Sequence, residues 1–150
     1  MKPDARQVQE RIDHLVARCR DEGMAVTPQR IAIFRALVSS DDHPSPEMLH
    51  QRVKKTMPSL SLATIYKTLD ALAEMGLVEE VSPVGDVKRY DGNHRPHHHL
   101  VCVKCKKVID FYSDSFDAIT PPRGMDGFVP QALTVQIKGT CARCDRSARK

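Results

Sequence analysis

A change of hydrophobic period lies within residues 62–81, which read LATIYKTLDALAEMGLVEEV. The first part has apolar residues at three- and four-residue spacing, the pattern of a helix with one buried face. These residues are Leu62, Ile65, Leu69 and Leu72. Gly76 predicts the end of the helix, because glycine tolerates the backbone conformation that follows a helix. The residues after Gly76 have a strand-like composition. We therefore expect a helix over about 62–75, followed by a strand.

Three further apolar stripes precede this helix and have the same helical spacing. Two of them begin with a capping residue followed by proline, at Thr27-Pro28 and at Ser45-Pro46. The stripes consist of Val8, Ile12, Leu15, Val16 and Cys19; of Ile31, Phe34, Leu37 and Val38; and of Met48, Leu49 and Val53. We expect four helices that share a core, with Cys19 as a packing residue.

The strand after Gly76 is expected to belong to a two-stranded hairpin. LVEEV (77–81) and VKRYD (87–91) flank SPVGD (82–86), in which Pro83 and Gly85 favour a turn. Helices followed by a small hairpin are the order of a winged helix-turn-helix.

The chain changes character after the hairpin. Short strand-like runs follow His97, namely HLVCV, VIDFY and ALTVQIK, with a short helix near 113–119. We predict an α+β protein, with a winged helix-turn-helix domain at 1–90, a hinge at 91–96 and a small α/β domain at 97–150.

Composition narrows the class of protein without naming a function. The 150 residues include no tryptophan and carry a formal net charge of +4, which permits nucleic-acid binding but does not argue for it. No stretch approaches the roughly 20 apolar residues that a membrane helix needs, and the N-terminus lacks the apolar core of a signal peptide. We therefore expect a cytoplasmic protein with no membrane partner.

The strongest chemical signal is the pair of motifs Cys102-x-x-Cys105 and Cys141-x-x-Cys144. Two such knuckles can complete a tetrahedral shell of four thiolates, which suits Zn²⁺ and leaves no open position for a substrate. A thioredoxin-type dithiol is disfavoured because two pairs are present. An iron–sulfur cluster is disfavoured because both pairs fit small zinc knuckles. We interpret the four cysteines as a structural zinc site.

A second group of potential ligands lies in DGNHRPHHHLVCVKC, residues 91–105. His97 and His99 are two residues apart in a predicted strand, so their side chains share one face. Carboxylates such as Asp91 and Asp110 can complete a site of nitrogen and oxygen donors, which favours iron, manganese or zinc. From these residues alone, an ordinary cluster of surface histidines is an equally good interpretation.

Six segments together resemble the ferric uptake regulator (Fur) family of metal-dependent bacterial repressors. They are TPQR (27–30), HPSPEML (43–49), PSLSLATIYKTLDALAEMGLV (58–78), RYD (89–91), HHHLVCVKCKKVIDF (97–111) and CARC (141–144). The resemblance implies a homodimer that binds a palindromic operator in double-stranded DNA. The N-terminal domain would bind DNA, and the C-terminal domain would dimerize.

The resemblance also implies two metals in each subunit. Cys102, Cys105, Cys141 and Cys144 match the family's structural zinc site. The regulatory site is matched by His43, Asp91, His97, His99 and Asp110. A metal with ligands from both domains would pin the hinge, and its loss would lower the affinity for DNA.

The regulatory ligands are most like those of the family's peroxide-responsive branch. The iron-sensing branch would have glutamate where Asp91 stands, and the run His-His-Asp-His where this chain has Pro96-His97-His98-His99. In the peroxide-responsive branch, Fe²⁺ at this site reacts with hydrogen peroxide and a ligand histidine is oxidised, here His43 or His97. Mn²⁺ would fill the site without that chemistry. An iron- or zinc-sensing repressor is the alternative.

The expected recognition helix also supplies candidate DNA contacts. With its apolar stripe facing the core, the residues nearer the DNA groove are Ser61, Ala63, Thr64, Tyr66 and Lys67, and Arg30 is a further phosphate contact. Without the resemblance, Thr64 and Tyr66 are equally well ordinary exposed helix residues. A metalloenzyme is the alternative of another class. It is disfavoured because the cysteine site is closed and no HExxH motif is present. A metal-storage protein would not need the winged helix.

Overall fold

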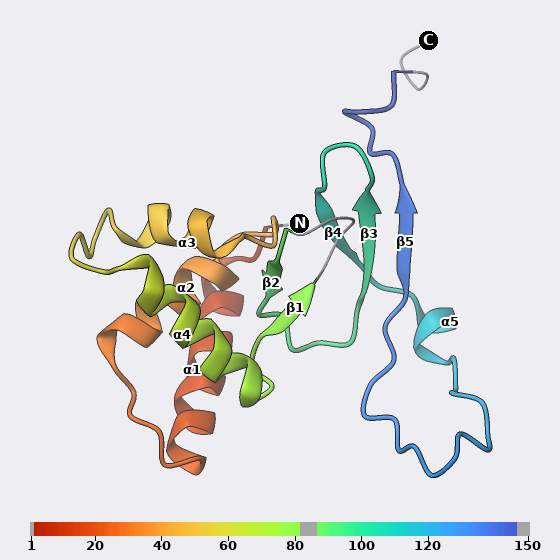
Figure 1. Cartoon of the computed structure of the whole chain (residues 1–150), viewed down its shortest axis with the longest axis horizontal. Coiled ribbons are helices and arrows are strands. Elements are labelled where there is room, and N and C mark those ends of the chain that lie inside the picture. Colours follow the sequence, from red (N-terminus) through yellow and green to blue (C-terminus); the bar gives the residue numbers. More distant parts are fainter. Residues whose placement is uncertain (1, 82–86, 147–150) are drawn as a thin grey trace. The chain divides into compact units, whose positions relative to one another are not determined.

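Helices α1 to α4 form the first part of the chain, and their starts follow from side chains that cap them. The computed structural model describes residues 2–81 and 87–146 (Figure 1). Asp4 and Gln7 form a capping box at α1, and the side chains of Thr27, Ser45 and Ser61 each accept a backbone N–H of the helix that follows. The helices are α1 (Ala5–Asp21), α2 (Pro28–Val38), α3 (Pro46–Val53) and α4 (Leu62–Glu74).

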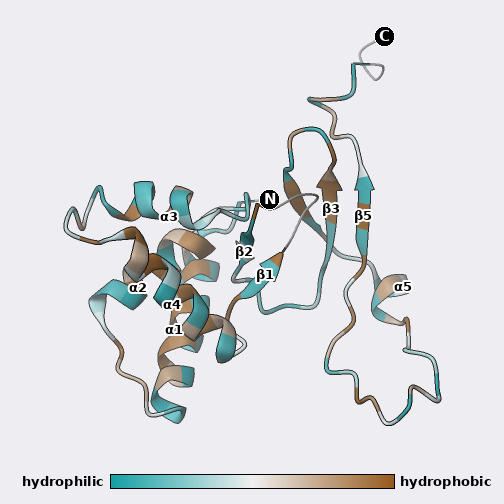
Figure 2. Cartoon of the chain, viewed as in Figure 1, coloured by the Kyte–Doolittle hydropathy of each residue, from teal (hydrophilic) through white to brown (hydrophobic). Residues whose placement is uncertain are grey.

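The four helices bury the predicted stripes in one hydrophobic core. Figure 2 shows apolar residues along the helices, and the side chains with less than 2% exposure include Leu15, Phe34, Leu49, Ile65, Leu69 and Leu72. Each such side chain contributes about 1.5–3 kcal/mol to folding. Cys19 is 1% exposed in this core, so its predicted packing role is confirmed. Ile33 is fully buried although it lies outside the predicted stripe, whereas Ile31 is only partly buried.

A two-stranded antiparallel wing follows α4. β1 (Glu79–Val81) pairs with β2 (Arg89–Asp91), with Glu80 opposite Tyr90. The predicted turn with Pro83 and Gly85 lies outside the described residues. The backbone N–H of Tyr90 also donates to the carbonyl of Pro44 at 3.2 Å, which ties β2 to the segment that precedes α3.

The second part of the chain is a three-stranded sheet with strand order β4-β3-β5. β3 (His98–Cys102) pairs antiparallel with β4 (Val108–Phe111) and parallel with β5 (Gln136–Gly139). The short helix α5 (Asp114–Asp117) lies between β4 and β5 in the chain. The residue types predicted these strands, but the parallel pairing of β3 with β5 depends on contacts distant in sequence.

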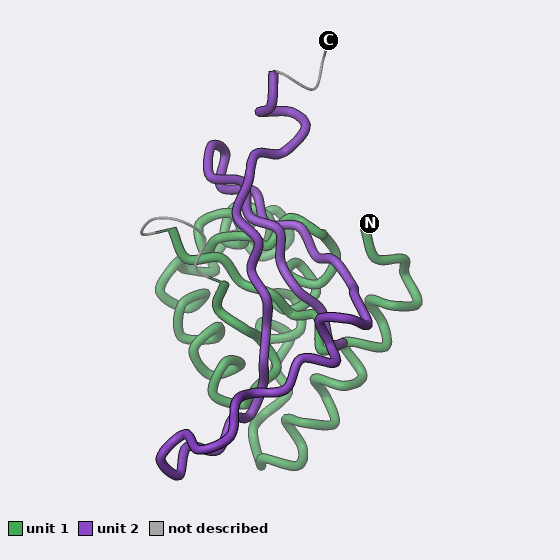
Figure 3. The backbone as a smooth tube through the Cα atoms, turned by 90° about the vertical axis from the view of Figure 1, so that its right-hand side faces the viewer, with its two compact units in different colours: residues 1–94 green, residues 95–150 purple. Residues whose placement is uncertain are grey.

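The chain divides into two compact units, residues 1–94 and residues 95–150 (Figure 3). The first holds the helices and the wing, and the second holds the sheet and α5. Within residues 2–81 and 87–146, no helix combines the length and the apolar character needed to cross a bilayer. The predicted fold class is confirmed: an α+β chain in which a winged helix-turn-helix precedes a small α/β unit.

Gly92 follows the wing strand at a point of close contact with α2. A Cβ atom at this position would lie 2.6 Å from Val38 Cγ1 and 3.3 Å from Leu37 Cδ2. Valine has little freedom to rotate away from such a clash. The absence of a side chain at position 92 therefore lets the chain that leaves β2 pack directly on the core.

We predict that Gly92→Ala destabilises the protein by about 1–3 kcal/mol through overpacking. Urea denaturation measures the change. Gly139→Ala is the matched control, because a Cβ at Gly139 meets no atom within 4 Å. Val38→Ala should suppress the effect of Gly92→Ala, because it removes the clashing methyl group. Equal costs for Gly92→Ala in the wild-type and Val38→Ala backgrounds would contradict this explanation.

Candidate metal centres

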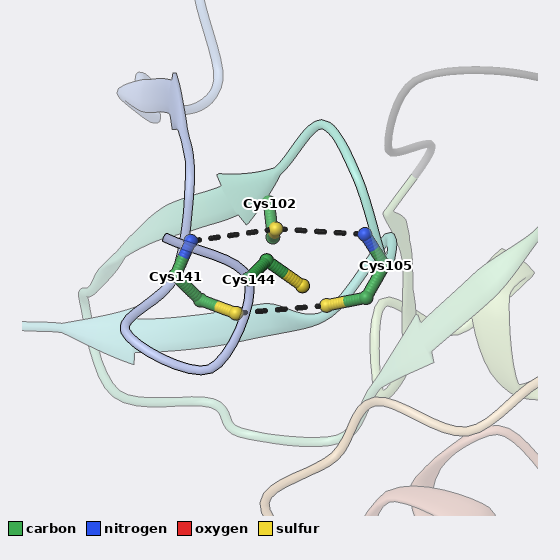
Figure 4. Close-up of side chains that lie close together, drawn as sticks. All are labelled: Cys102, Cys105, Cys141 and Cys144. Carbon is green, nitrogen blue, oxygen red and sulfur yellow. Dashed lines mark hydrogen bonds between the residues drawn. The ribbon is translucent and has the colours of Figure 1, made fainter. Parts of the chain in front are cut away.

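Four cysteines of the second unit converge at one end of its sheet (Figure 4). Cys102 is the last residue of β3, and Cys105 follows in the turn to β4. Cys141 and Cys144 lie after β5, which the parallel pairing with β3 brings to the same end. All four sulfur atoms lie within 4.8 Å of one another, a donor set that fits one metal ion.

Backbone N–H groups point at the sulfur of Cys102. The N–H groups of Cys105 and Cys141 donate to it at 3.5 and 3.4 Å. These bonds, with that from Cys105 first, lower the pKa of Cys102 to about 6, so its thiolate is favoured at neutral pH. Lys106 adopts a left-handed backbone with φ of 62°, which closes the turn of the knuckle.

The fourth thiol has the opposite preference. Hydrogen bonds of the Cys144 thiol with the sulfurs of Cys105 and Cys141 raise the pKa of Cys144 to about 12, because they favour its protonated form. A bound divalent cation removes this conflict, since it stabilises all four thiolates together. Positive side chains also lie close: Lys104 Nζ donates to the carbonyl of Cys144 at 3.3 Å, and Cys105 raises the pKa of Arg143.

The first unit contributes a buried pair of potential ligands. His43 Nε2 lies 3.2 Å from Asp91 Oδ2, and both side chains are buried. His43 has a φ of 49°, a left-handed conformation that is uncommon for residues other than glycine. Asp91 Oδ1 accepts the N–H of Asn93 at 2.8 Å, which fixes the orientation of the carboxylate.

The second unit contributes two imidazoles and a carboxylate. His97 Nε2 lies 3.1 Å from His99 Nε2, and Asp110 Oδ1 lies 3.5 and 3.3 Å from these two atoms. His99 is opposite Asp110 in the β3–β4 register. His97 Nδ1 donates to the carbonyl of Arg95 at 2.6 Å, so in the neutral ring Nε2 carries the lone pair. This tautomer is the one that can bind a metal through Nε2.

His98 faces away from this triad, in keeping with the period of two along a strand. Its Nε2 lies 2.9 Å from Asp117 Oδ1, and its Nδ1 accepts the N–H of Val135 at 3.1 Å. The ring centroids of Phe111 and Phe116 lie 5.5 and 5.6 Å from that of His98. His98 therefore joins α5 and the segment before β5 to β3, a role that its place in the histidine run did not indicate.

The candidate DNA contacts lie at the start of α4 and on α2. The Ser61 side chain caps α4, and its Oγ also lies 2.9 Å from Thr64 Oγ1. The remaining α4 candidates are exposed, namely Ala63, Tyr66 and Lys67. Arg30 donates to the carbonyl of Ala25. Sequence reasoning missed Glu47, which accepts a hydrogen bond from the Tyr66 hydroxyl at 2.7 Å, because no local pattern relates residues 19 positions apart.

Comparison with protein families identifies the family of this chain. The model of the ferric uptake regulator family matches residues 21–137, which is most of the chain. This chain belongs to the ferric uptake regulator family. The resemblance noted in the sequence is thus confirmed. A Fur-family protein is a transcriptional regulator, so the alternative of a non-regulatory metalloenzyme is wrong.

Individual relatives include peroxide-responsive regulators. The chain is 30% identical to the peroxide-responsive repressor PerR of Staphylococcus epidermidis over 145 residues, which is 96% of this chain and 97% of that one. It is 28% identical to the peroxide stress regulator of Campylobacter jejuni, with a TM-score of 0.63, covering 89% of this chain and 98% of the other.

A more distant Fur protein shares the fold. The Helicobacter pylori ferric uptake regulator superposes with a TM-score of 0.72 at 16% identity, covering 96% of both chains. At this identity the likeness establishes the fold alone. The Fur-family architecture therefore extends over nearly all of this chain.

We predict that Cys102→Ala removes the tightly bound metal of the cysteine cluster, because three sulfurs and an open position bind less firmly than a closed shell. Elemental analysis after dialysis should show about one metal equivalent fewer per chain than in the wild type. Cys19→Ala is the control, since this thiol lies in the helical core and should change stability but not metal content. Unchanged metal content in Cys102→Ala would contradict the assignment.

Proposed function

We propose that this Fur-family protein is a dimeric repressor that binds a palindromic DNA operator when metal is bound and releases it in response to hydrogen peroxide. Family membership and the two peroxide-responsive relatives support this function. The observation that carries it is the division of the nitrogen and oxygen donors. One pair lies in the unit that contains the helix-turn-helix, and the triad lies in the other.

We assign a structural Zn²⁺ to Cys102, Cys105, Cys141 and Cys144. The convergence of four sulfurs and the opposed pKa shifts of Cys102 and Cys144 support a divalent cation with soft ligands. The ion would join the chain that follows β5 to the end of β3. It leaves no coordination position for a substrate, so its role is to stabilise the second unit.

We assign the regulatory metal to His43, Asp91, His97, His99 and Asp110. Three imidazoles and two carboxylates form a nitrogen and oxygen donor set that suits Fe²⁺ or Mn²⁺. Two lines of support are the tautomer of His97, fixed by Arg95, and the orientation of Asp91, fixed by Asn93. When bound, the ion would supply redox chemistry if it is iron and only a structural link if it is manganese.

The regulatory ion would couple metal to DNA through the hinge at 91–96. Ligands from a DNA-binding domain at 1–90 and a dimerization domain at 97–150 would hold the two at a fixed relation. In a twofold dimer, this sets the spacing of the two recognition helices to that of the operator half-sites. Loss of the ion frees the hinge and weakens DNA binding. A repressor works where the chromosome lies, so we place the protein in the cytoplasm.

The sheet of the second unit supports a homodimer. Leu100 on β3 is opposite Ile137 on β5, and these side chains are 36% and 42% exposed. In the segment before β5, Phe128 and Val129 are 67% and 72% exposed. Apolar side chains exposed to this degree are typical of surfaces that bind another protein. A second copy of the chain is the partner that the family resemblance implies.

Peroxide would act on a ligand histidine. In the net reaction, one oxygen atom of H₂O₂ is inserted into a ring C–H bond of His43 or His97, the other leaves as water, and the ring is oxidised by two electrons. Fe²⁺ would supply the redox chemistry. The oxidised ring is a poorer ligand, so the metal leaves and repression ends. The alternative is an iron- or zinc-sensing uptake repressor, in which metal loss alone releases DNA.

We propose that the start of α4 reads the operator in the major groove. Its short side chains allow close approach to base edges, and Tyr66 is available for base or backbone contact. The proposed contacts are Arg30, Ser61, Ala63, Thr64, Tyr66 and Lys67. The exposure of Ala63, Tyr66 and Lys67 supports the assignment of this face of α4 to DNA binding. The Thr64 hydroxyl already forms a hydrogen bond with the Ser61 hydroxyl.

We predict that Tyr66→Ala abolishes operator binding while metal content stays unchanged, because Tyr66 contributes no metal ligand. A gel-shift assay with duplexes selected by the wild type measures binding, and elemental analysis measures the metals. Glu74→Ala is the matched control near the other end of the same helix. Retained operator binding in Tyr66→Ala would show that the recognition surface lies elsewhere.

We predict that peroxide treatment of the iron-loaded protein adds about 16 Da, one oxygen atom, to the peptide that contains His43 or His97. Mass spectrometry of tryptic peptides detects the change, and fragmentation of each peptide locates the oxygen on the histidine rather than on Met48, which shares the peptide of His43. The manganese-loaded protein is the control and should show no such gain. If neither peptide changes with iron while DNA release follows free iron or zinc, the metal-sensing alternative is the correct one.

A further inference from the structure

The hydrogen bond between Tyr66 and Glu47 joins the exposed face of α4 to the start of α3. The Tyr66 hydroxyl donates to Glu47 Oε1 at 2.7 Å. Tyr66 is 37% exposed, and Glu47, the second residue of α3, is exposed as well. An exposed hydrogen bond adds little to stability, because water competes for both partners. A role for this pair in binding at the protein surface is therefore more consistent with its position than a role in folding.

The pair lies in a hollow between α3, α4 and the wing. The hollow has a volume of about 380 Å³ and is lined by Pro46, Glu47, Tyr66, Val87 and Lys88. The ammonium group of Lys88 pairs with Glu80 at 3.4 Å. The Tyr66 hydroxyl lowers the pKa of Glu47, with smaller contributions from the Glu47 backbone N–H and Ser45, so the carboxylate is ionised at neutral pH. Glu47 in turn raises the pKa of Tyr66.

This bond restricts what Tyr66 can offer to DNA. A phenol has one hydrogen to donate, and here Glu47 accepts it. The hydroxyl can then accept a hydrogen bond, but it cannot donate one to a phosphate oxygen. Its remaining contacts are those of the ring and of the oxygen lone pairs, which suit base edges. Phosphate contacts bind every sequence alike, whereas base contacts discriminate between sequences.

We propose that Glu47 is a positioning residue that sets the sequence specificity of DNA binding through Tyr66. The inference rests on the proposed function, in which α4 lies against DNA. Glu47 acts in two ways. Its hydrogen bond fixes the orientation of the Tyr66 ring, and the bond strengthens when bound DNA excludes water. Its negative charge repels the phosphates of any DNA that comes close. On the operator, the correct base contacts outweigh this repulsion, and on other sequences nothing does.

Substitutions at position 47 separate the two effects. Glu47→Gln keeps an oxygen that can accept from Tyr66 but removes the charge, and Glu47→Ala removes both. Tyr66→Phe removes the hydroxyl and leaves the charge. Glu74→Gln is the control, since it removes a carboxylate from the other end of α4. Binding is measured with the full-length, metal-loaded protein, using a duplex selected by the wild type from a random pool and a shuffled duplex of the same composition.

We expect Glu47→Ala to lower the ratio of the affinity for the selected duplex to that for the shuffled duplex about tenfold. The variant should bind the shuffled duplex more strongly and the selected duplex more weakly. Glu47→Gln should lower it about threefold, by strengthening shuffled binding alone. Glu74→Gln should leave the ratio unchanged. In the Tyr66→Phe background, Glu47→Ala should no longer weaken selected binding. These effects must appear with metal content and circular dichroism equal to those of the wild type.

The hydrogen bond has an independent readout in the free protein. Carbon-13 NMR of ring-labelled tyrosine follows the ionisation of each tyrosine separately. Tyr66 should titrate above the ordinary tyrosine pKa in the wild type and closer to it in Glu47→Ala. Identical titration of Tyr66 in both proteins would overturn the proposal, because no bond would then orient the ring.

The same experiment distinguishes a failure of the proposed DNA-binding function from a failure of the proposed role of Glu47. If the wild type selects no duplex from the pool, the DNA-binding function itself is wrong. If the wild type selects a duplex and every Glu47 variant keeps the wild-type ratio, the function stands and the role of Glu47 is wrong.

Discussion

The convergence of electron-pair donors in two clusters imposes the main constraint on this molecule. Four sulfur atoms lie within 4.8 Å of one another, and His97 and His99 face each other through Nε2 atoms 3.1 Å apart. Donor atoms held so close repel one another unless a cation or a proton lies between them. Within the cysteine cluster, backbone N–H groups lower the pKa of Cys102, and hydrogen bonds with Cys105 and Cys141 raise that of Cys144. Bound cations would satisfy both sets of donors at once.

The two clusters differ in what an ion would do. The cysteine cluster lies wholly within the second unit, so an ion there affects only local stability. The proposed regulatory ligands come from both units, so an ion that bound them all would add a constraint that the polypeptide lacks. In the proposed function, it is the second kind of site that would convert metal occupancy into a change of DNA affinity. This is the physical reason to separate a structural metal from a regulatory one.

The sequence predicted the parts that depend on local pattern. Capping residues placed the starts of α2 and α3, apolar spacing placed the bounds of α4 to within one residue, and the CxxC motifs identified the four cysteines. The parallel pairing of β3 with β5, which brings Cys141 and Cys144 beside Cys102, depends on contacts distant in sequence and was not predicted. The same holds for the bond between Glu47 and Tyr66, and for that between His98 and Asp117. The close approach of Gly92 to Val38 likewise depends on tertiary packing, which no local pattern indicates.

Thermodynamic linkage offers the most direct test that metal and DNA are coupled ligands of this protein. The affinity of the zinc-loaded protein for Mn²⁺, which avoids peroxide chemistry, is measured by calorimetry with and without the selected operator duplex. We expect the operator to tighten Mn²⁺ binding at least about tenfold, by the same factor by which Mn²⁺ tightens operator binding. The factor should fall to one in His43→Ala. Equal Mn²⁺ affinity with and without operator in the wild type would contradict the coupling.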